Sequence, residues 1–434
     1  MNTESVVPLV DGPKRNGTLP SATNSALHFP KNFLWGTATS ATQVEGHITN
    51  EWTNFVAPDG KHCRVACDHY HRYREDIQLM QDLGVKAYRL SIEWSRLQSA
   101  PNALLNRTEL ERYCDKLDCL RAAGITPMVV LHHFSNPLWI YRNGGWTNPA
   151  TVAAFENFVT QLVPALRSRV RIWNTFNEPD TYASCSYLLG EFPPFHKVRL
   201  DSFRSVINHM GAAHLRSCEI IRRAGSAAGE IEVGYTKNWT HFGTLKPNRP
   251  WDWFMAKTSH TIFNRWVMDA FTRAGRNNAA TFQGLNYYGR VRFHNGHSLT
   301  PARGRSREEL AQLGVFSDDM FERYPPGMET VLLDLHRRVG LPIYITEHGA
   351  ACDDEKFRIA DLRANLTAVH RAITQGADVR GFFYWSLLDN FEWQFGYTKK
   401  FGLLSVDFSN IKLPRFPKPI AEIFRTACLE NRVP

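Results

Sequence analysis

Apolar residues gather in eight short runs along the chain, and most runs are followed by a polar loop and an amphipathic stretch. The runs are continuous rather than alternating, which is typical of parallel strands covered on both faces. The amphipathic stretches predict helices over residues 71–83, 109–123, 155–166 and 206–224, and Gly84 and Gly124 mark the ends of the first two. The predicted strands span residues 33–36, 87–92, 126–131, 171–176, 231–235, 282–287, 342–346 and 380–385.

Eight strands that alternate with helices predict a closed (β/α)8 TIM barrel of the α/β class. A doubly wound open sheet is the alternative, but neither G-x-G-x-x-G nor G-x-x-x-x-G-K-[ST] follows any of the runs. We therefore assign residues 28–434 to a single barrel domain. Residues 1–27 are rich in Ser, Thr, Asn, Gly and Pro, and we expect them to form a disordered N-terminal extension.

Charge and cysteine content narrow the class of protein. The chain has 51 Lys and Arg against 42 Asp and Glu, but the basic residues are scattered, which favours a solvated surface over nucleic-acid binding. No stretch approaches the length of a membrane-spanning apolar helix, and the N-terminus lacks the apolar core of a secretory signal. Eight cysteines without paired metal-ligand spacing predict free thiols in a reducing compartment, and hence a cytoplasmic location.

Two glutamates stand at the ends of predicted strands. Glu178 comes shortly after the run that ends at Phe176, and Glu347 directly follows the run that ends at Thr346. Reactive groups of a barrel lie just past the C-terminal ends of its strands, so these two carboxyl groups can face each other across a substrate. Glycoside hydrolysis needs such a pair, because one carboxyl protonates the departing oxygen while the other attacks the anomeric carbon. A single strand-end glutamate is more often solvated or salt-bridged, so the hypothesis depends on the pair.

A series of motifs between Phe33 and Pro419 resembles glycoside hydrolase family 1, the β-glucosidase family. The motifs include FLWGTATSATQVEG at 33–46, WNTFNEPD at 173–180, YITEHGA at 344–350 and FYWSLLDNFEW at 383–393. The resemblance implies that Glu178 is the acid/base and Glu347 the nucleophile of a retaining mechanism. It further implies supporting roles for Arg89 and Asn286, and substrate contacts from Gln43, His133, Asn177, Tyr288, Trp385, Glu392 and Trp393.

The activity that this resemblance implies is hydrolysis of terminal β-D-glucosides by double displacement, without a metal or organic cofactor. Galactosides and fucosides come next, because one carboxylate at Glu392 can accept a hydrogen bond from either epimer of the 4-hydroxyl. A transglycosylase using the same two carboxylates is the alternative. A glycan-binding barrel without catalysis would typically lack Glu178 or Glu347, and a thioglucosidase often replaces the acid/base by Gln. The oligomeric state stays open.

Two positions depart from the family pattern. His348 stands where Asn usually follows the nucleophile, and Phe134 stands where Trp usually follows the histidine that binds the sugar. Both changes bear on sugar preference and rate, because neither removes a catalytic group. His69 and His71 could suggest a metal site, but they begin a predicted helix with Asp68 as its N-cap, so we assign no metal.

Overall fold

The computed structural model describes residues 26–273 and 280–434 of the 434-residue chain. Leu27 accepts a hydrogen bond from the backbone N–H of Val433 at 3.0 Å, so the two ends of the described chain lie together. The extension expected over residues 1–27 falls almost wholly outside the described residues, and its disorder stays a prediction.

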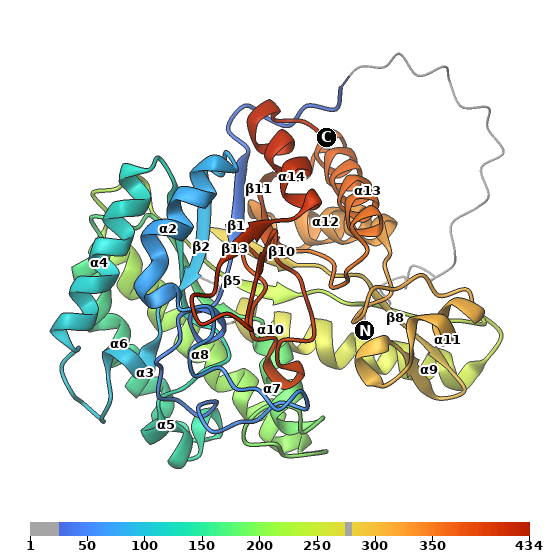
Figure 1. The fold of residues 1–434 in the computed structure, drawn as a ribbon. Coiled ribbons are helices and arrows are strands. Elements are labelled where there is room, and N and C mark those ends of the chain that lie inside the picture. The colour runs from blue at the N-terminus through green and yellow to red at the C-terminus, as the bar shows by residue number, and fades with distance from the viewer. Residues whose placement is uncertain (1–25, 274–279) are drawn as a thin grey trace.

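Eight parallel strands close into a barrel, as the pattern of apolar runs predicted (Figure 1). The strands follow one another round the barrel in chain order, and the last pairs with the first through Leu34 opposite Gly381. Closure excludes the doubly wound open sheet. The strands are β1 (Leu34–Ala38), β2 (Ala87–Ser91), β3 (Thr126–His132), β4 (Ile172–Asn177), β5 (Glu232–Asn238), β7 (Phe282–Asn286), β10 (Ile343–His348) and β11 (Val379–Trp385).

Helices cover the outside of the barrel, and the four predicted helices are confirmed as α2 (His69–Asp82), α4 (Arg107–Ala122), α6 (Ala150–Leu166) and α8 (Leu200–Ala224). Gly84 and Gly124 adopt left-handed backbone just past α2 and α4, which is the conformation that a glycine helix end requires. None of the described helices is both long and apolar enough to cross a membrane. The other α-helices are α1 (Ala41–Val44), α3 (Trp94–Leu97), α5 (Leu138–Arg142), α7 (Pro179–Tyr187), α9 (Pro250–Ser259), α10 (Val267–Arg273), α11 (Arg307–Gln312), α12 (Pro325–Val339), α13 (Glu355–Thr374) and α14 (Pro419–Glu430).

Side chains fill the inside of the barrel. Met128, Ile172 and Phe282 are fully buried there with Phe383 in one cluster. Gly36 on β1 shows how tight this interior is, because a Cβ at that position would lie 2.4 Å from the ring of Phe383. The filled interior leaves no room for a ligand between the strands, so the ends of the barrel are where a substrate site is expected.

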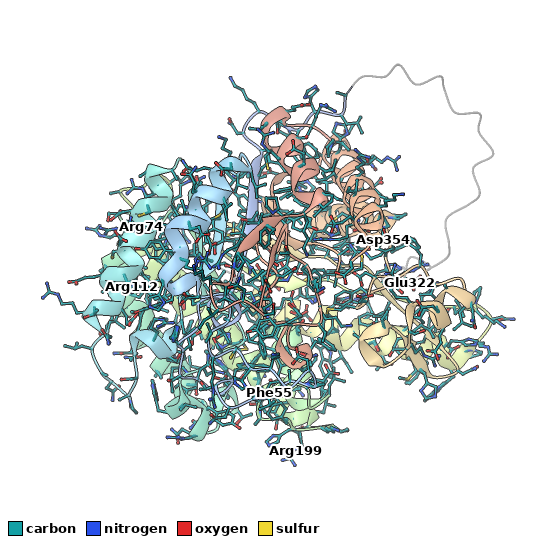
Figure 2. All side chains as sticks on the ribbon, viewed as in Figure 1. Phe55, Arg74, Arg112, Arg199, Glu322 and Asp354 are labelled. Carbon is teal, nitrogen blue, oxygen red and sulfur yellow. The ribbon has the colours of Figure 1, made fainter. Side chains whose placement is uncertain are left out.

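A small sheet that the sequence did not predict projects beside β5 and β7, on the right in Figure 1. Its strands are β6 (His241–Thr244), β8 (Arg290–His294) and β9 (His297–Leu299), and α9 packs against β6 and β8. Glu322, labelled in Figure 2, ties this sheet to the following loop through ion pairs with Arg290 and Arg292. A hairpin of β12 (Leu404–Val406) and β13 (Arg415–Pro417) was also not predicted.

Candidate active site

Glu178 and Glu347 lie at the C-terminal end of the barrel. Glu178 is the first residue past β4, and Glu347 is the next-to-last residue of β10. Their exposed fractions are only 5% and 3%. Glu178 has left-handed backbone (φ 39°, ψ 63°), a conformation that costs free energy for a residue with a side chain and that clusters at functional sites. Its backbone N–H donates to the carbonyl of Thr236 at 2.9 Å, which holds this turn against β5.

Two side chains hold the carboxylate of Glu347. Arg89, fully buried on β2, donates to one oxygen at 2.6 Å, and the hydroxyl of Tyr288 donates to the other at 2.8 Å. Burial raises the pKa of Glu347 to about 7; the charge of Arg89 opposes this shift, and the charge of Glu178 adds to it.

Glu178 is held by neutral amides instead. Asn286 donates from Nδ2 to one carboxyl oxygen at 2.5 Å, and Asn238 donates to the other at 3.1 Å. The orientation of the Asn286 amide is fixed, because the hydroxyl of Thr346 donates to its oxygen at 2.7 Å. The two glutamates are thus equally buried but differ in their neighbours, one held by a cation and the other by amides.

Asn177 connects the two carboxyl groups. Its amide oxygen accepts from Arg89 at 2.6 Å and from Asn286 at 3.2 Å, while its Nδ2 lies 3.1 Å from Nε2 of His133. Burial lowers the pKa of His133 well below its ordinary value, and Arg89 contributes in the same direction. Nδ1 of His133 is buried and has no hydrogen-bond partner in the described residues.

The neighbouring histidine faces the other way, because successive side chains of a strand point to opposite faces. His132 contacts Asn136 from Nε2 at 3.1 Å and packs edge to face on Trp146, outside the barrel.

One wall of the site consists of an acidic group and two indole rings. Gln43 donates from Nε2 to Glu392 at 3.1 Å, and Trp385 is also hydrogen-bonded to that carboxyl. Burial raises the pKa of Glu392 to about 8, and the charge of Glu347 adds to the shift. The rings of Trp385 and Trp393 lie nearly parallel to that of His133, with centroids 5.8 and 6.2 Å away. Every residue that the resemblance implied for the site is thus found at this end of the barrel.

The two departures from the family pattern lie behind the site rather than in it. Nδ1 of His348 donates to the backbone carbonyl of Tyr287 at 2.7 Å, and its Nε2 lies 3.3 Å from Asp361. The ring of Phe134 packs against Trp393 at a centroid distance of 5.4 Å. His348 therefore contacts the segment that carries Tyr288 and not a ligand, while Phe134 supports an indole of the wall.

Sequence reasoning missed three residues beside Glu178. Asn238 is the last residue of β5, where the strand-end rule would have found it, but the predicted strand ended at Tyr235. Lys237, just before it, pairs with Asp180 at 2.8 Å, and both side chains are almost fully buried. Burial raises the pKa of Asp180 to about 7, although Lys237 opposes the shift.

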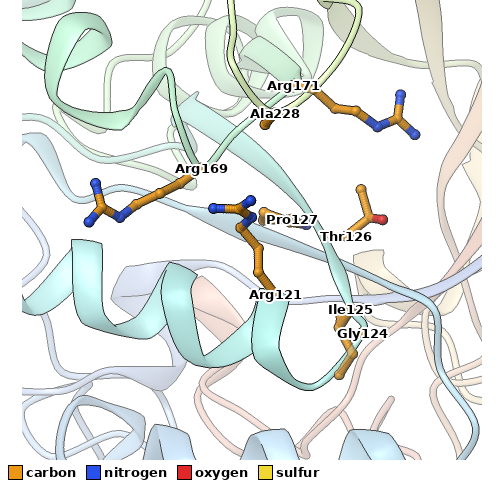
Figure 3. Close-up of a pocket in the computed structure, with 8 residues that line it drawn as sticks. All are labelled: Arg121, Gly124, Ile125, Thr126, Pro127, Arg169, Arg171 and Ala228. Atoms are coloured by element: carbon orange, nitrogen blue, oxygen red, sulfur yellow. The ribbon is translucent and has the colours of Figure 1, made fainter.

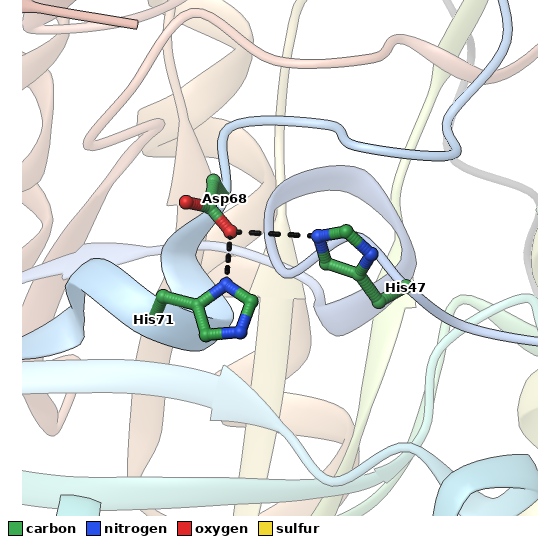
Figure 4. Close-up of side chains that lie close together, drawn as sticks. All are labelled: His47, Asp68 and His71. Carbon is green, nitrogen blue, oxygen red and sulfur yellow. Dashed lines mark hydrogen bonds and ion pairs between the residues drawn. The ribbon is translucent and has the colours of Figure 1, made fainter. Parts of the chain in front are cut away.

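Two further features lie away from this site. A cavity of about 250 Å³ opens at the opposite end of the barrel, where Thr126 and Pro127 begin β3, and three arginines line it: Arg121, Arg169 and Arg171 (Figure 3). Within the described residues, one group of side chains has metal-ligand spacing, and it lies outside the barrel: His47, Asp68 and His71 (Figure 4).

Comparison with known proteins agrees with this geometry. Residues 25–292 and 276–432 match the model of glycosyl hydrolase family 1. The chain is 32% identical to "Beta-glucosidase 47" of Arabidopsis thaliana, over 94% of this chain and 86% of the relative. It is also 32% identical to a "Bifunctional beta-D-glucosidase/beta-D-fucosidase" of Bifidobacterium breve, over 88% and 94%. The solved family 1 β-glucosidase of Thermotoga maritima superposes with a TM-score of 0.83 at 27% identity, covering 94% of this chain and 99% of the other. The chain therefore belongs to glycosyl hydrolase family 1 and is a glycoside hydrolase.

Proposed function

We propose that the chain is a retaining β-glucosidase in which Glu347 is the nucleophile and Glu178 the acid/base. The observation that carries this assignment is the difference between the two carboxyl environments. Glu347 is paired with the cation of Arg89, which stabilises its ionised form, whereas Glu178 is hydrogen-bonded by neutral amides. An anion is needed at the attacking carboxylate and a proton at the other.

The reaction follows from these positions in two displacements. Glu178 gives its proton to the glycosidic oxygen as that bond breaks, and the carboxylate of Glu347 bonds to the anomeric carbon to form a glycosyl ester. Ester formation removes the charge of Glu347, so Glu178 can then take a proton from water while the water attacks the same carbon. The ester bond breaks, Glu347 is again a carboxylate, and the sugar leaves with its original β-configuration.

Other residues of the site would bind the sugar. The Asn177 amide would hydrogen-bond the 2-hydroxyl, a contact that strengthens in the transition state. His133, Gln43 and Glu392 would bind the remaining hydroxyls, and the face of Trp385 would cover the C–H surface of the ring.

A glucoside is the proposed substrate, because both relatives described above are named for β-glucosidase activity. The Bifidobacterium breve protein is also named for β-D-fucosidase activity, which supports fucosides as secondary substrates. These names favour water over a sugar acceptor, so the transglycosylase alternative is not proposed.

We also propose a cytoplasmic location. The structure has all eight cysteines as free thiols, a state that a reducing compartment maintains. Fractionation of the source cells, with the enzyme detected by antibody, tests this directly. Recovery of the protein from a secretory compartment would contradict it.

A panel of nitrophenyl glycosides tests the proposed function, with the first-formed sugar identified by NMR. We expect the highest kcat/KM on the β-glucoside, lower values on the β-fucoside and β-galactoside, and the β-anomer as the first product. An α-anomer as first product would contradict the retaining mechanism, and a preference for another sugar would contradict the proposed substrate. Running the reactions with an added alcohol measures the share of transfer to an acceptor.

A further inference from the structure

Three side chains with metal-ligating atoms converge at the surface of the protein, outside the active site (Figure 4). His47 lies in the loop after α1, whereas Asp68 and His71 lie at the start of α2. Nε2 of His47 is 3.6 Å from Oδ1 of Asp68, and Nδ1 of His71 is 2.6 Å from the same oxygen. Two imidazoles from separate segments of the chain thus point at one carboxylate oxygen.

Solvent and ions can reach this cluster. The side chains of His47, Asp68 and His71 have exposed fractions of 49%, 25% and 54%. The ion pairs that Asp68 makes in the described residues are with these two histidines, so the carboxylate is not matched by an Arg or Lys. The two imidazole rings also contact each other edge to face, with centroids 5.3 Å apart. A cation that binds here would therefore contact the Asp68 carboxylate and, beside it, two imidazoles that can also act as metal ligands.

The spacing of the donor atoms fits a small divalent ion. Zinc bonds to imidazole nitrogen and carboxylate oxygen at about 2.0–2.2 Å in a tetrahedron, which places neighbouring ligand atoms about 3.3 Å apart. The distance from His47 to Asp68 is close to that value. The shorter distance from His71 to Asp68 is that of a hydrogen bond, which a metal would replace. All three donors lie within 4.8 Å of one another, so small side-chain rotations complete the set.

His69, which could suggest a metal site together with His71 in the sequence, has another partner. His69 is buried, and its Nδ1 lies 2.7 Å from Asp76, which also accepts hydrogen bonds from Arg415. Asp68 stands at the N-cap of α2 as predicted, but its side chain makes no capping hydrogen bond and contacts His71 instead. The Asp68 carboxylate is therefore not used as a cap.

We propose that His47, Asp68 and His71 bind one divalent transition-metal ion, with Zn²⁺ as the best match and water in the remaining position. Imidazole and carboxylate ligands suit Zn²⁺, Ni²⁺ and Cu²⁺, whereas Ca²⁺ and Mg²⁺ prefer oxygen ligands alone. The ion would link the loop after α1 to the start of α2. That loop follows Gln43, which holds Glu392, so the ion stabilises the fold beside the site without taking part in the reaction.

Titration of the untagged enzyme with ZnCl₂ after EDTA treatment and dialysis tests the proposal. Calorimetry should find one ion per chain, and the melting temperature should rise with ZnCl₂ concentration, because an ion that binds only the folded state stabilises it. CaCl₂ should produce neither effect. Absence of zinc binding, or zinc binding without any rise in melting temperature, would overturn the proposal.

Variants locate the ion. His47→Gln removes one ligand from an exposed loop and should weaken zinc binding by at least roughly tenfold, whereas the matched control His297→Gln, at an exposed histidine of β9, should bind as the parent does. Asp68→Asn should weaken binding similarly. Cobalt gives a second reading, because Co²⁺ in a tetrahedral site has strong visible absorption that His47→Gln should abolish. Equal zinc binding by His47→Gln and the parent would place the ion elsewhere.

Hydrolysis of a nitrophenyl glucoside should be unchanged by EDTA at a temperature well below unfolding. If the proposed function is wrong, the hydrolysis rate will show it, whereas zinc binding will be unaffected.

Discussion

Arg89 lies 2.6 Å from Glu347, and both side chains are buried at the C-terminal end of the barrel. The arginine does not hold the pKa of Glu347 at its ordinary value of 4.5, because burial and the charge of Glu178 together raise it to about 7. The proposed nucleophile is therefore in its reactive, ionised form only near and above neutral pH.

The first prediction concerns the acidic limb of the pH profile. We expect kcat/KM on dinitrophenyl β-glucoside to fall about tenfold per pH unit below a pKa near 7, because protonated Glu347 cannot attack. Glu178→Gln removes the neighbouring charge, so the pKa of Glu347 should decrease and the limb should move to lower pH. The activated leaving group keeps this variant measurable. A limb that stays in place or moves to higher pH in Glu178→Gln would show that the two groups do not interact as proposed.

The second prediction concerns stability. A carboxyl whose pKa is higher in the folded state than in the unfolded state contributes stability that is present below the unfolded value and is lost as pH rises through the folded value. For Glu347 the loss falls between pH 4.5 and 7 and amounts to about 3 kcal/mol. Urea unfolding should therefore find that Glu347→Gln gains stability relative to the parent as pH rises from 4.5 to 8. A constant difference across this range would contradict the raised pKa.

The barrel could be predicted because its strands are buried on both faces and are therefore continuous apolar runs. The β6–β8–β9 sheet could not, because each of its strands is short and mostly only half-buried, as at His241–Thr244. The sequences of β6 and β9 carry neither a continuous run nor a clear alternation, and the alternation of β8 covers only the five residues Arg290–His294.

The residues of the site were predictable where they follow an apolar run, as Glu178 and Glu347 do. Asn238 was missed because Lys237 interrupts the run before it, and a buried lysine is not expected in a strand without its partner. That partner, Asp180, lies in the first turn of α7, and only the folded structure brings the two together. His47 was missed as a neighbour of His71 for the same reason, since contacts between distant segments leave no local pattern.

The third prediction concerns His348, which the family pattern alone could not interpret. Its Nδ1 holds the carbonyl of Tyr287, and the next residue, Tyr288, donates to Glu347. His348→Ala should therefore lower kcat about tenfold on dinitrophenyl β-glucoside with little change in KM. The substitution weakens the support of Glu347 and leaves the residues that bind the sugar in place. His348→Asn, which keeps a donor, should retain more activity.

A double-mutant cycle with Tyr288→Phe separates positioning from general destabilisation. If His348 acts through the Tyr288 hydroxyl, His348→Ala should cost little further activity in the Tyr288→Phe background. Additive losses in kcat would mean that His348 has a structural role unconnected to Tyr288.

The last prediction separates the two carboxylates by role. Glu347→Ala should nearly abolish turnover on every substrate, because the glycosyl ester cannot form. Glu178→Ala should lose about 10²–10⁴-fold in activity, and only on substrates whose leaving group needs a proton. With dinitrophenyl β-glucoside, which leaves unaided, Glu178→Ala should show a burst as the glycosyl ester accumulates.

Azide then distinguishes the roles through the stereochemistry of the product. In Glu178→Ala, azide should attack the glycosyl ester from the β face, restore turnover and give the β-glycosyl azide. In Glu347→Ala, azide can occupy the space left by the missing carboxylate and attack the substrate directly, which gives the α-azide. NMR of the two products distinguishes these results, because the anomeric coupling constants of α- and β-azides differ. An α-azide from Glu178→Ala, or a β-azide from Glu347→Ala, would mean that the nucleophile and the acid/base have been assigned the wrong way round.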